Sequence, residues 1–427
     1  MKIYENPARP SWNELVKRPE LDHRSLTETV SSVLKDIREN GDKAAKSYTQ
    51  KFDGVVLDET TVSPAEFNEA EAALSSGLKA AIIQAAENIK TFHLHQVVHP
   101  ETIQTMPGIE CWRKSVGIEK VGLYIPGGSA PLFSTILMLG IPAKIAGCKE
   151  IVLCSPPDKE GKLHPAILFS AQLVGIDNVF KIGGVQAIGA MAYGTETILQ
   201  VYKIFGPGNQ YVTCAKQLVQ LDGVAIDMPA GPSEVAVLAD ETAHPDFVAA
   251  DLLSQAEHGP DSQVLLIATS RSLLDEVKIS VSRQLELLPR KDLAAQSLAN
   301  SKLVYLPDMA AAIELSNVYA PEHLIIACKN AEAIGQKITN AGSVFLGNYA
   351  PESVGDYASG TNHTLPTKGY ARAYSGVGVD SFVKKITFQK LSEKGLHNIA
   401  RTVIAMAEAE GLKAHADAVR VRMGQQS

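Results

Sequence analysis

The sequence predicts an α/β protein built on two parallel sheets, and three observations lead to this prediction. From Val121 onward, short apolar runs alternate with helical segments, and the gaps between runs are too long for hairpins. The runs fall into two series, and a length of 427 residues suits two or three domains. A mainly helical stretch precedes the first series and another follows the second. We therefore expect a helical N-terminal segment, two α/β units and a helical C-terminal tail.

Residues 1–120 show helical spacing and the residues that start and stop helices. Ser25 and Glu28 form a capping box, and Asn40-Gly41 supplies a stop. A second helix is expected over about 78–98, where His95 and His99 lie one turn apart and could hold a metal. A solvated helix face explains these two histidines better. The apolar stripe of the first helix consists of Leu26, Val30, Val33, Leu34 and Ile37.

The two series of strands define the expected division of the chain. The first series reads VGLYI, EIVLC, NVFKI, YKIF and AIDM, and the second reads EVAVLA, QVLLIA, KLVYL, HLIIAC and SVFLG. After about Gly376 the apolar runs stop. We expect an N-terminal segment (1–20), one α/β domain (21–120 with 233–375), a second α/β domain (121–232) and a helical tail (376–427).

Composition excludes several classes of protein. With 47 acidic against 40 basic residues the net charge is −7, and no basic run occurs, so no nucleic-acid partner is expected. The longest apolar stretch, residues 130–147, contains two prolines and a lysine, which argues against a membrane span. The first residues carry no secretory signal, and five cysteines without CxxC spacing favour a reducing, cytoplasmic location.

Three glycine clusters follow predicted parallel strands. They are Tyr124-Ile-Pro-Gly-Gly, Ile182-Gly-Gly-Val-Gln186 and Phe205-Gly-Pro-Gly-Asn209. The carboxyl ends of parallel strands are where open α/β sheets bind ligands, and glycine lets the backbone approach a phosphate. None matches GxGxxG or the P-loop pattern, and ordinary turns also use these residues. Three clusters at one edge favour a nucleotide site.

A predicted helix near residues 245–259 carries two polar residues on its apolar stripe. Gln255 continues the spacing of Val248 and Leu252, and His258 follows three residues later. Buried polar groups need partners, so this pair could serve a metal or a polar ligand. The alternative is a helix end that emerges into solvent, because Gly259-Pro260 terminates it.

Two further segments carry candidate side chains. Glu322 and His323 stand at the start of a predicted strand, where an adjacent acid and imidazole could divide proton-transfer work. A polar loop over 355–367, expected at a carboxyl edge, offers Asp356 and His363 as ligands. Surface positions would explain both segments equally well.

The tail carries an apolar stripe that leads to two candidate polar residues. Ile399, Val403 and Met406 place Glu410 on the same face of a helix. His415 would face elsewhere in a straight helix, so both reach one site only if Gly411 bends the chain.

Eight motifs in this order and spacing resemble histidinol dehydrogenases, and the resemblance covers essentially the whole chain. They are GLYIPGGSAPLFSTILML, KIGGVQAIGAMAYGTE, KIFGPGNQYV, DMPAGPSEV, DLLSQAEHGPDSQ, APEHL, PESVGDYASGTNHTLPT and AEGLKAHADAV. The resemblance implies incomplete Rossmann-like domains, with NAD bound by residues 121–232. It also implies oxidation of L-histidinol through L-histidinaldehyde to L-histidine with two NAD+, the last step of histidine biosynthesis, by a homodimer with one Zn2+ per subunit.

The resemblance also implies roles for individual residues. Glu322 and His323 would be catalytic, with Glu322 activating water and His323 accepting the alcohol proton. Zinc would be held by Gln255, His258, Asp356 and His415, the last from the partner subunit through the tail. Contacts to NAD would come from Tyr124, Gln186 and Asn209, and contacts to substrate from Ser233, His323 and Glu410 together with the zinc-ligand residues Gln255, His258, Asp356 and His415.

Other functions remain open at this point. A paralogous zinc- and NAD-dependent dehydrogenase could act on another hydroxymethyl compound, since fold does not fix substrate. A zinc hydrolase could use the same metal and Glu322 without a nicotinamide, and a nucleotide sensor would carry out no chemistry. An assay with zinc, NAD+ and L-histidinol separates these alternatives.

Overall fold

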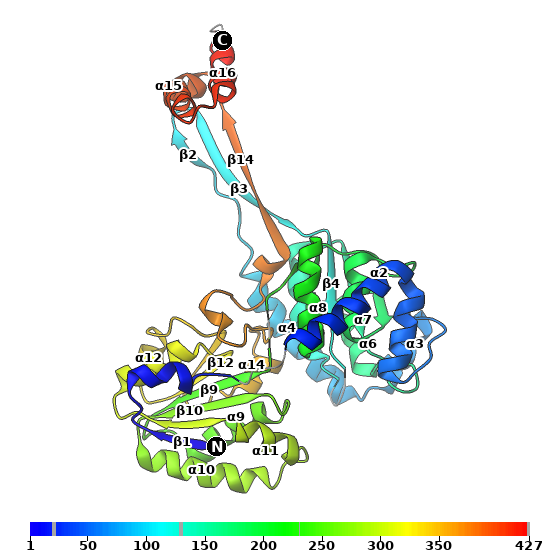
Figure 1. Cartoon of the computed structure of the whole chain (residues 1–427), viewed down its shortest axis with the longest axis vertical. Helices are drawn as coiled ribbons and strands as arrows, with labels where there is room; N and C mark the ends of the chain where they lie inside the picture. Colours follow the sequence, from blue (N-terminus) through cyan, green and yellow to red (C-terminus); the bar gives the residue numbers. More distant parts are fainter. Residues whose placement is uncertain (19–22, 128–130, 230, 425–427) are drawn as a thin grey trace.

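The computed structural model describes residues 1–18, 23–127, 131–229 and 231–424. These residues form two α/β units and a long arm (Figure 1). Two all-parallel sheets confirm the predicted fold class. Gly128 of the first glycine cluster and the expected boundary at residue 20 lie outside the described residues.

The first unit contains a five-stranded parallel sheet in the order β6-β5-β4-β7-β8. The chain enters at β4, adds β5 and β6 on one side and then β7 and β8 on the other. This reversal creates a crevice at the carboxyl ends of β4 and β7. The strands are β4 (Lys120–Tyr124), β5 (Glu150–Ser155), β6 (Asn178–Lys181), β7 (Lys203–Phe205) and β8 (Ala225–Ile226). The connecting helices are α5 (Ser134–Ala146), α6 (Pro165–Leu173), α7 (Gly184–Tyr193) and α8 (Gln210–Val219).

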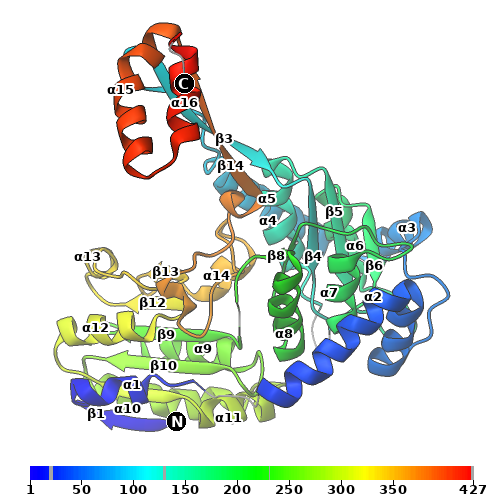
Figure 2. The same cartoon turned by 45° about the horizontal axis from the view of Figure 1, so that its top comes forward.

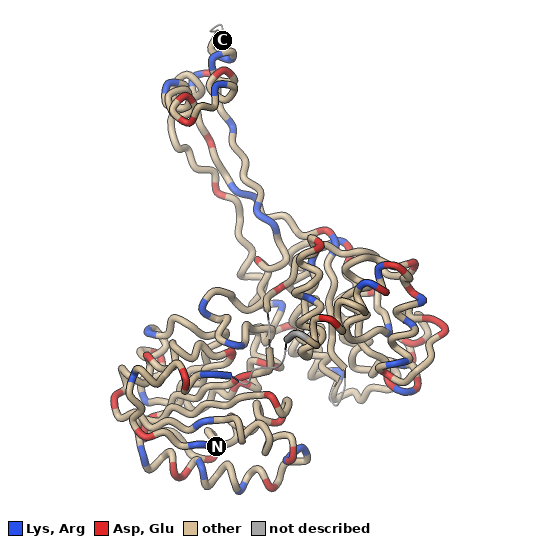
Figure 3. Tube along the Cα trace, in the orientation of Figure 1, with Lys and Arg blue, Asp and Glu red and all other residues tan. Residues whose placement is uncertain are grey.

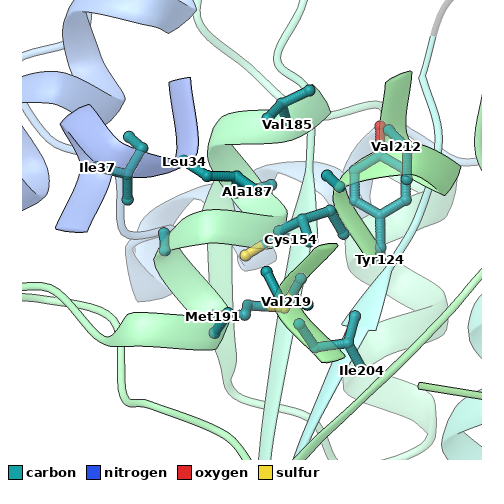
Figure 4. Packing of buried hydrophobic residues seen from close by; sticks show 14 of the residues in the cluster. Leu34, Ile37, Tyr124, Cys154, Val185, Ala187, Met191, Ile204, Val212 and Val219 are labelled. Atoms are coloured by element: carbon teal, nitrogen blue, oxygen red, sulfur yellow. The ribbon is translucent and has the colours of Figure 1, made fainter. Parts of the chain in front are cut away.

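The N-terminal helices cover this same sheet, which differs from the expectation that residues 21–120 share a unit with 233–375. They are α2 (His23–Asp53), which bends at Gly41, α3 (Pro64–Ala73) and α4 (Ser76–Leu94). The apolar stripe of α2 packs on α7 (Figure 4), where a Cβ on Gly189 would lie 3.2 Å from both Leu34 and Ile37. A stripe predicts that a helix is covered, but it does not specify which sheet covers it.

The second unit contains a six-stranded parallel sheet in the order β1-β11-β10-β9-β12-β13. Helices on both faces enclose two apolar layers, because successive residues of β9 point to opposite faces. The strands are β1 (Lys2–Glu5), β9 (Glu234–Ala239), β10 (Gln263–Ala268), β11 (Lys302–Tyr305), β12 (His323–Ala327) and β13 (Ser343–Leu346). The helices are α1 (Trp12–Leu15), α9 (Pro245–Ala256), α10 (Arg271–Leu285), α11 (Lys291–Ala299), α12 (Met309–Tyr319), α13 (Ala331–Gly335) and α14 (Glu352–Tyr357).

The arm extends away from both units and ends in two helices (Figure 2). Its antiparallel strands are β2 (Ile103–Met106), β3 (Ile109–Gly117) and β14 (Val383–Leu391), and its helices are α15 (Glu393–Ala409) and α16 (Lys413–Arg422). The expectation of a purely helical tail is therefore wrong for β14. Most of this strand is exposed, so it lacks the apolar run that identifies a buried strand.

Charge is distributed evenly over the molecule. Acidic and basic residues are interspersed along the trace of both units (Figure 3).

Over the described residues, none of the helices combines the length and apolar character needed to cross a membrane. Short 3-10 helices span Arg9–Ser11, Gln220–Asp222, Tyr370–Arg372 and Val379–Phe382.

Candidate active site

A cleft of ≈ 970 Å³ is lined by residues of both units. One wall comes from the carboxyl ends of β4 and β7, with Tyr124 and residues 207–209. The other wall contains Ser233, which precedes β9, and His258, which follows α9. The fold thus brings predicted nucleotide-binding and substrate-binding residues to one cavity.

The first wall depends on a close approach of the backbone at Gly206. This residue has φ of 125°, and a Cβ there would lie 2.0 Å from the carbonyl oxygen of Tyr124. Only glycine fits such a position. The Tyr124 hydroxyl accepts a hydrogen bond from the backbone N–H of Gly184 at 3.2 Å, which joins the first two glycine clusters.

Gln186 and Asn209 lie on the helices that leave this edge. Gln186 is buried in α7, where its Nε2 donates to Asp53 at 3.4 Å and its Oε1 has no hydrogen-bond partner among the described residues. Asn209 caps α8, and its Oδ1 accepts from the backbone N–H groups of Tyr211 and Val212 at 3.0 and 3.1 Å. A buried acceptor without a donor is the kind of group that a bound hydroxyl satisfies.

The second wall lies at the amino ends of its strands. His323 is the first residue of β12, and Ser233 directly precedes β9. Helix α9 runs back from the carboxyl end of β9, and α14 follows β13, so Gln255 and Asp356 also return to this edge. The expectation that the loop over 355–367 lies at a carboxyl edge is therefore wrong for Asp356, whose Oδ1 is 3.2 Å from His323 Nε2.

Both side chains of the acid–imidazole pair are buried and held by one backbone residue. The backbone N–H of Glu234 donates to Glu322 Oε2 at 2.8 Å, and its carbonyl oxygen lies 3.2 Å from His323 Nδ1. Because a carbonyl can only accept, Nδ1 carries a proton, and Nε2 faces Asp356. Nε2 is therefore the atom of His323 that gains or loses a proton.

Electrostatics separate the two members of this pair. Burial raises the pKa of Glu322 to about 8. Burial lowers the pKa of His323, but the carboxylates of Glu322 and Asp356 outweigh it and raise that pKa to about 10. The site therefore favours a proton on the imidazole while both carboxylates face it.

Three potential metal donors from this chain meet beside His323. The buried Gln255 lies in the last turn of α9, His258 follows the helix, and Asp356 lies on α14 close enough to alter the pKa of His258. Partial desolvation lowers the pKa of His258 below its ordinary value, which favours the neutral imidazole that a metal ligand requires. Burial likewise lowers the pKa of His363, whose Nε2 lies 3.3 Å from the Ser134 hydroxyl.

The predicted tail residues are not near this site in their own chain. Glu410 caps the end of α15 and His415 lies in α16, and both are exposed. The arm holds these helices away from the two sheets (Figure 1). Over the described ranges, no three His, Cys, Asp or Glu side chains form a group that could hold a metal ion. The second pair of candidates, His95 and His99, lies beyond the end of α4 at Leu94.

Sequence reasoning missed three charged groups at this site, the partly buried Arg18 and the buried Glu234 and Glu352. Arg18 donates to both oxygens of Glu234 at 2.9 and 2.8 Å, which anchors the residue that holds Glu322 and His323. Glu352 contacts Ser254 and Gln255 from beneath the site. Its signal was available, since Glu352 and Asp356 are spaced i, i+4 and so share one face of a helix.

Comparison with known proteins identifies the family. The sequence matches the histidinol dehydrogenase family over residues 16–423. It is 60% identical over 423 residues to a histidinol dehydrogenase of Bacteroides thetaiotaomicron, with 99% of each chain covered. It is 51% identical over 424 residues to that of Vibrio parahaemolyticus, covering 99% of this chain and 97% of the relative.

The structure gives the same result. It superimposes on the crystal structure of histidinol dehydrogenase from Elizabethkingia anophelis with a TM-score of 0.97 and 56% identity, covering 99% of this chain and 98% of that one. The matches in sequence and in structure extend over both units and the arm. The chain belongs to the histidinol dehydrogenase family.

Proposed function

We propose that the chain oxidises L-histidinol through L-histidinaldehyde to L-histidine with two NAD+, as the last step of histidine biosynthesis. The observation that carries this proposal is a cleft that joins the glycine-lined sheet edge to Ser233 and His258, with the buried pair Glu322 and His323 in contact with Asp356 behind the second wall. Family membership supplies the substrate, since the cleft alone does not distinguish one hydroxymethyl compound from another.

The donor set fits zinc. An imidazole nitrogen, a carboxylate and an amide oxygen, from His258, Asp356 and Gln255, are ligands of the kinds that Zn2+ accepts. His415 of the partner subunit would complete the set. One Zn2+ per subunit would supply positive charge that orients the imidazole and amine of the substrate.

The other wall fits NAD. Tyr124 and Gln186 lie beside the Gly183-Gly184 turn, and the buried Gln186 Oε1, which has no partner among the described residues, would accept from a ribose hydroxyl. The backbone at Gly206 has no room for a side chain, and Asn209 stands at the N-terminus of α8, where a phosphate is favoured. NAD+ supplies the hydride acceptor for both oxidations.

Residues of this chain would accept the protons released in the two oxidations. In the first oxidation the alcohol carbon loses a hydride to NAD+, and His323 Nε2 accepts the hydroxyl proton. In the second, Glu322 in its ionised form would take a proton from the water that adds to the aldehyde, and the hydrate would then give a hydride to the second NAD+ and its hydroxyl proton to His323 Nε2. Glu322 and Asp356 both raise the pKa of His323, so engagement of Asp356 as a metal ligand would remove one of the two contributions that keep the imidazole protonated.

We further propose a homodimer in which each arm supplies Glu410 and His415 to the partner's cleft. Apolar side chains on the arm are exposed, and an exposed apolar surface is typical of an interface. These side chains are Ile103, Met106, Ile386, Phe388, Leu391, Met406, Leu412 and Val421.

All five cysteines are free thiols, in keeping with a proposed cytoplasmic location.

One assay tests the proposed function. Purified protein with Zn2+, NAD+ and L-histidinol should yield two NADH per L-histidine without free aldehyde. Turnover of another hydroxymethyl compound in preference to histidinol would favour a paralogous dehydrogenase. Hydrolysis without NADH formation would contradict the proposal.

A further inference from the structure

Glu352 is a buried carboxylate beneath the proposed zinc ligands. It is 1% exposed and lies in the first turn of α14, where Ser254 Oγ donates to its Oε1 at 2.7 Å. The amide of Gln255 faces both of its oxygens. With Nε2 as the donor, the two distances are 3.1 and 3.3 Å.

The chemistry of the pair decides which end of the amide faces Glu352. An ionised carboxylate only accepts hydrogen bonds and an amide oxygen cannot donate, so Gln255 Nε2 is the atom that faces Glu352 in its ionised form. The amide oxygen is then directed away from Glu352. Asp356 follows Glu352 by one helical turn, so α14 supplies both an expected metal ligand and the acceptor behind another ligand.

This orientation matters because only one end of an amide can bind a metal. An amide oxygen has lone pairs for Zn2+, whereas the NH2 group offers none. A glutamine without a partner could rotate and present either end. A hydrogen-bond acceptor that orients a metal ligand typically contributes about 10- to 100-fold to metal affinity.

We propose that Glu352 is a positioning residue that fixes the Gln255 amide with its oxygen toward the metal. This inference rests on the proposed function. In this assignment Glu352 acts through the amide of Gln255 and is not itself a metal ligand.

A double-mutant cycle on zinc affinity tests the proposal. The variants are Glu352→Gln, Gln255→Leu and their combination, with Glu352→Leu as a stronger substitution. Zinc dissociation constants are measured on apo-protein by competition with a chromophoric chelator, without substrate or NAD+. Circular dichroism and the melting temperature check folding.

We expect Glu352→Leu to weaken zinc binding by about 10- to 100-fold. Glu352→Gln keeps one acceptor oxygen and should lose less. In the Gln255→Leu background neither change should weaken zinc binding further, because the ligand that Glu352 orients is gone. If Glu352→Leu does not fold, the isosteric Glu352→Gln cycle decides the question alone.

Ser254→Ala is the matched control. It removes the other hydrogen bond to Glu352 but leaves the Gln255 contact, so zinc affinity should stay at the wild-type value. Equal losses in both backgrounds would show that Glu352 binds zinc directly or acts only on the fold, and would overturn the inference. A loss in Ser254→Ala equal to that in Glu352→Gln would also overturn it. A wild-type chain that binds no zinc would refute the proposed function as well.

Discussion

At the scale of single residues, one backbone unit organises the acid–base chemistry. The backbone N–H of Glu234 donates to the Glu322 carboxylate, and the carbonyl oxygen of Glu234 accepts from His323 Nδ1. The Glu234 side chain forms an ion pair with Arg18. The two groups of the pair thus have fixed positions relative to each other. Their hydrogen bonds differ, which allows each to serve a different proton transfer.

The first prediction concerns this division of labour. Glu322→Gln should permit the first oxidation but slow the second by about 10² to 10⁴, because the amide cannot take a proton from water. Single-turnover measurement of NADH and aldehyde checks this. His95→Asn, a change at an exposed residue, is the control that should leave both steps unchanged. Equal loss of both oxidations would show that the two residues do not divide the work.

The second prediction concerns Asp53, which accepts from Gln186 behind the nucleotide edge. Burial raises the pKa of Asp53 from its ordinary 3.8 to about 6. The folded state therefore holds this proton more tightly, and the stabilisation present below pH 3.8 is lost as pH rises through about 6. Asp53→Asn should gain stability relative to wild type across this range, on the order of 1 kcal/mol because the site is partly solvated. Urea denaturation at pH 4 and pH 7 checks it, and a gain that is equal at both values would exclude this cause.

At the scale of elements, a buried ion pair secures the loop between β7 and α8. Lys216 Nζ lies 2.5 Å from Asp227 Oδ1 and donates to the Gly206 carbonyl oxygen at 2.7 Å. The backbone N–H of Gly206 donates to Asp227 Oδ2 at 2.8 Å. Both polar groups of the glycine that closely approaches Tyr124 are thus satisfied by one pair.

The third prediction follows from this pair. Lys216→Met leaves Asp227 as an uncompensated buried charge and should lower the free energy of unfolding by about 3 to 5 kcal/mol. Lys216→Met combined with Asp227→Asn should recover a large part of that loss. Urea denaturation of both variants provides the measurement. A double variant no more stable than the single one would show that packing, and not charge, causes the loss.

At the scale of the whole molecule, the arm separates Glu410 and His415 from the cleft of their own chain (Figure 2). Gly395 in α15 packs directly on the turn between β2 and β3, where a Cβ would lie 2.1 Å from the Gly108 carbonyl oxygen. The two helices are therefore docked on the arm strands. An element that is docked at a distance from both sheets needs another surface to meet, and an identical subunit provides one.

The fourth prediction tests exchange of the arms. His415→Ala and His258→Ala homodimers should each be inactive. After mixing and reassembly, about half of the dimers contain one of each chain, and each of these has one intact site, so about a quarter of wild-type activity should return. If His415 served its own chain, every site would carry one lesion and no activity would return even with subunit exchange confirmed.

The sequence alone was enough to predict the two series of strands, but not the edge strand β1, which lies in the expected N-terminal segment and pairs with β11 of the second unit. Apolar runs such as 121–125 and 234–239 became buried parallel strands, because burial on both faces leaves a continuous apolar pattern. The motifs also pointed to the residues that line the cleft, including Tyr124 and His258. These signals depend on residues that are close together in the chain, so they can be recognised in the sequence.

Only the tertiary structure decided where those elements meet. The apolar stripe on α2 predicts that one face of the helix is buried, but it does not specify which sheet covers it. The exposed strand β14 lacks the apolar run that would predict a strand. Asp356 reaches His323 at the amino edge of its sheet because α14 returns the chain across it, which spacing cannot show. Helix docking and sheet orientation are set by packing between segments far apart in the chain, and such contacts leave no periodic trace in the sequence.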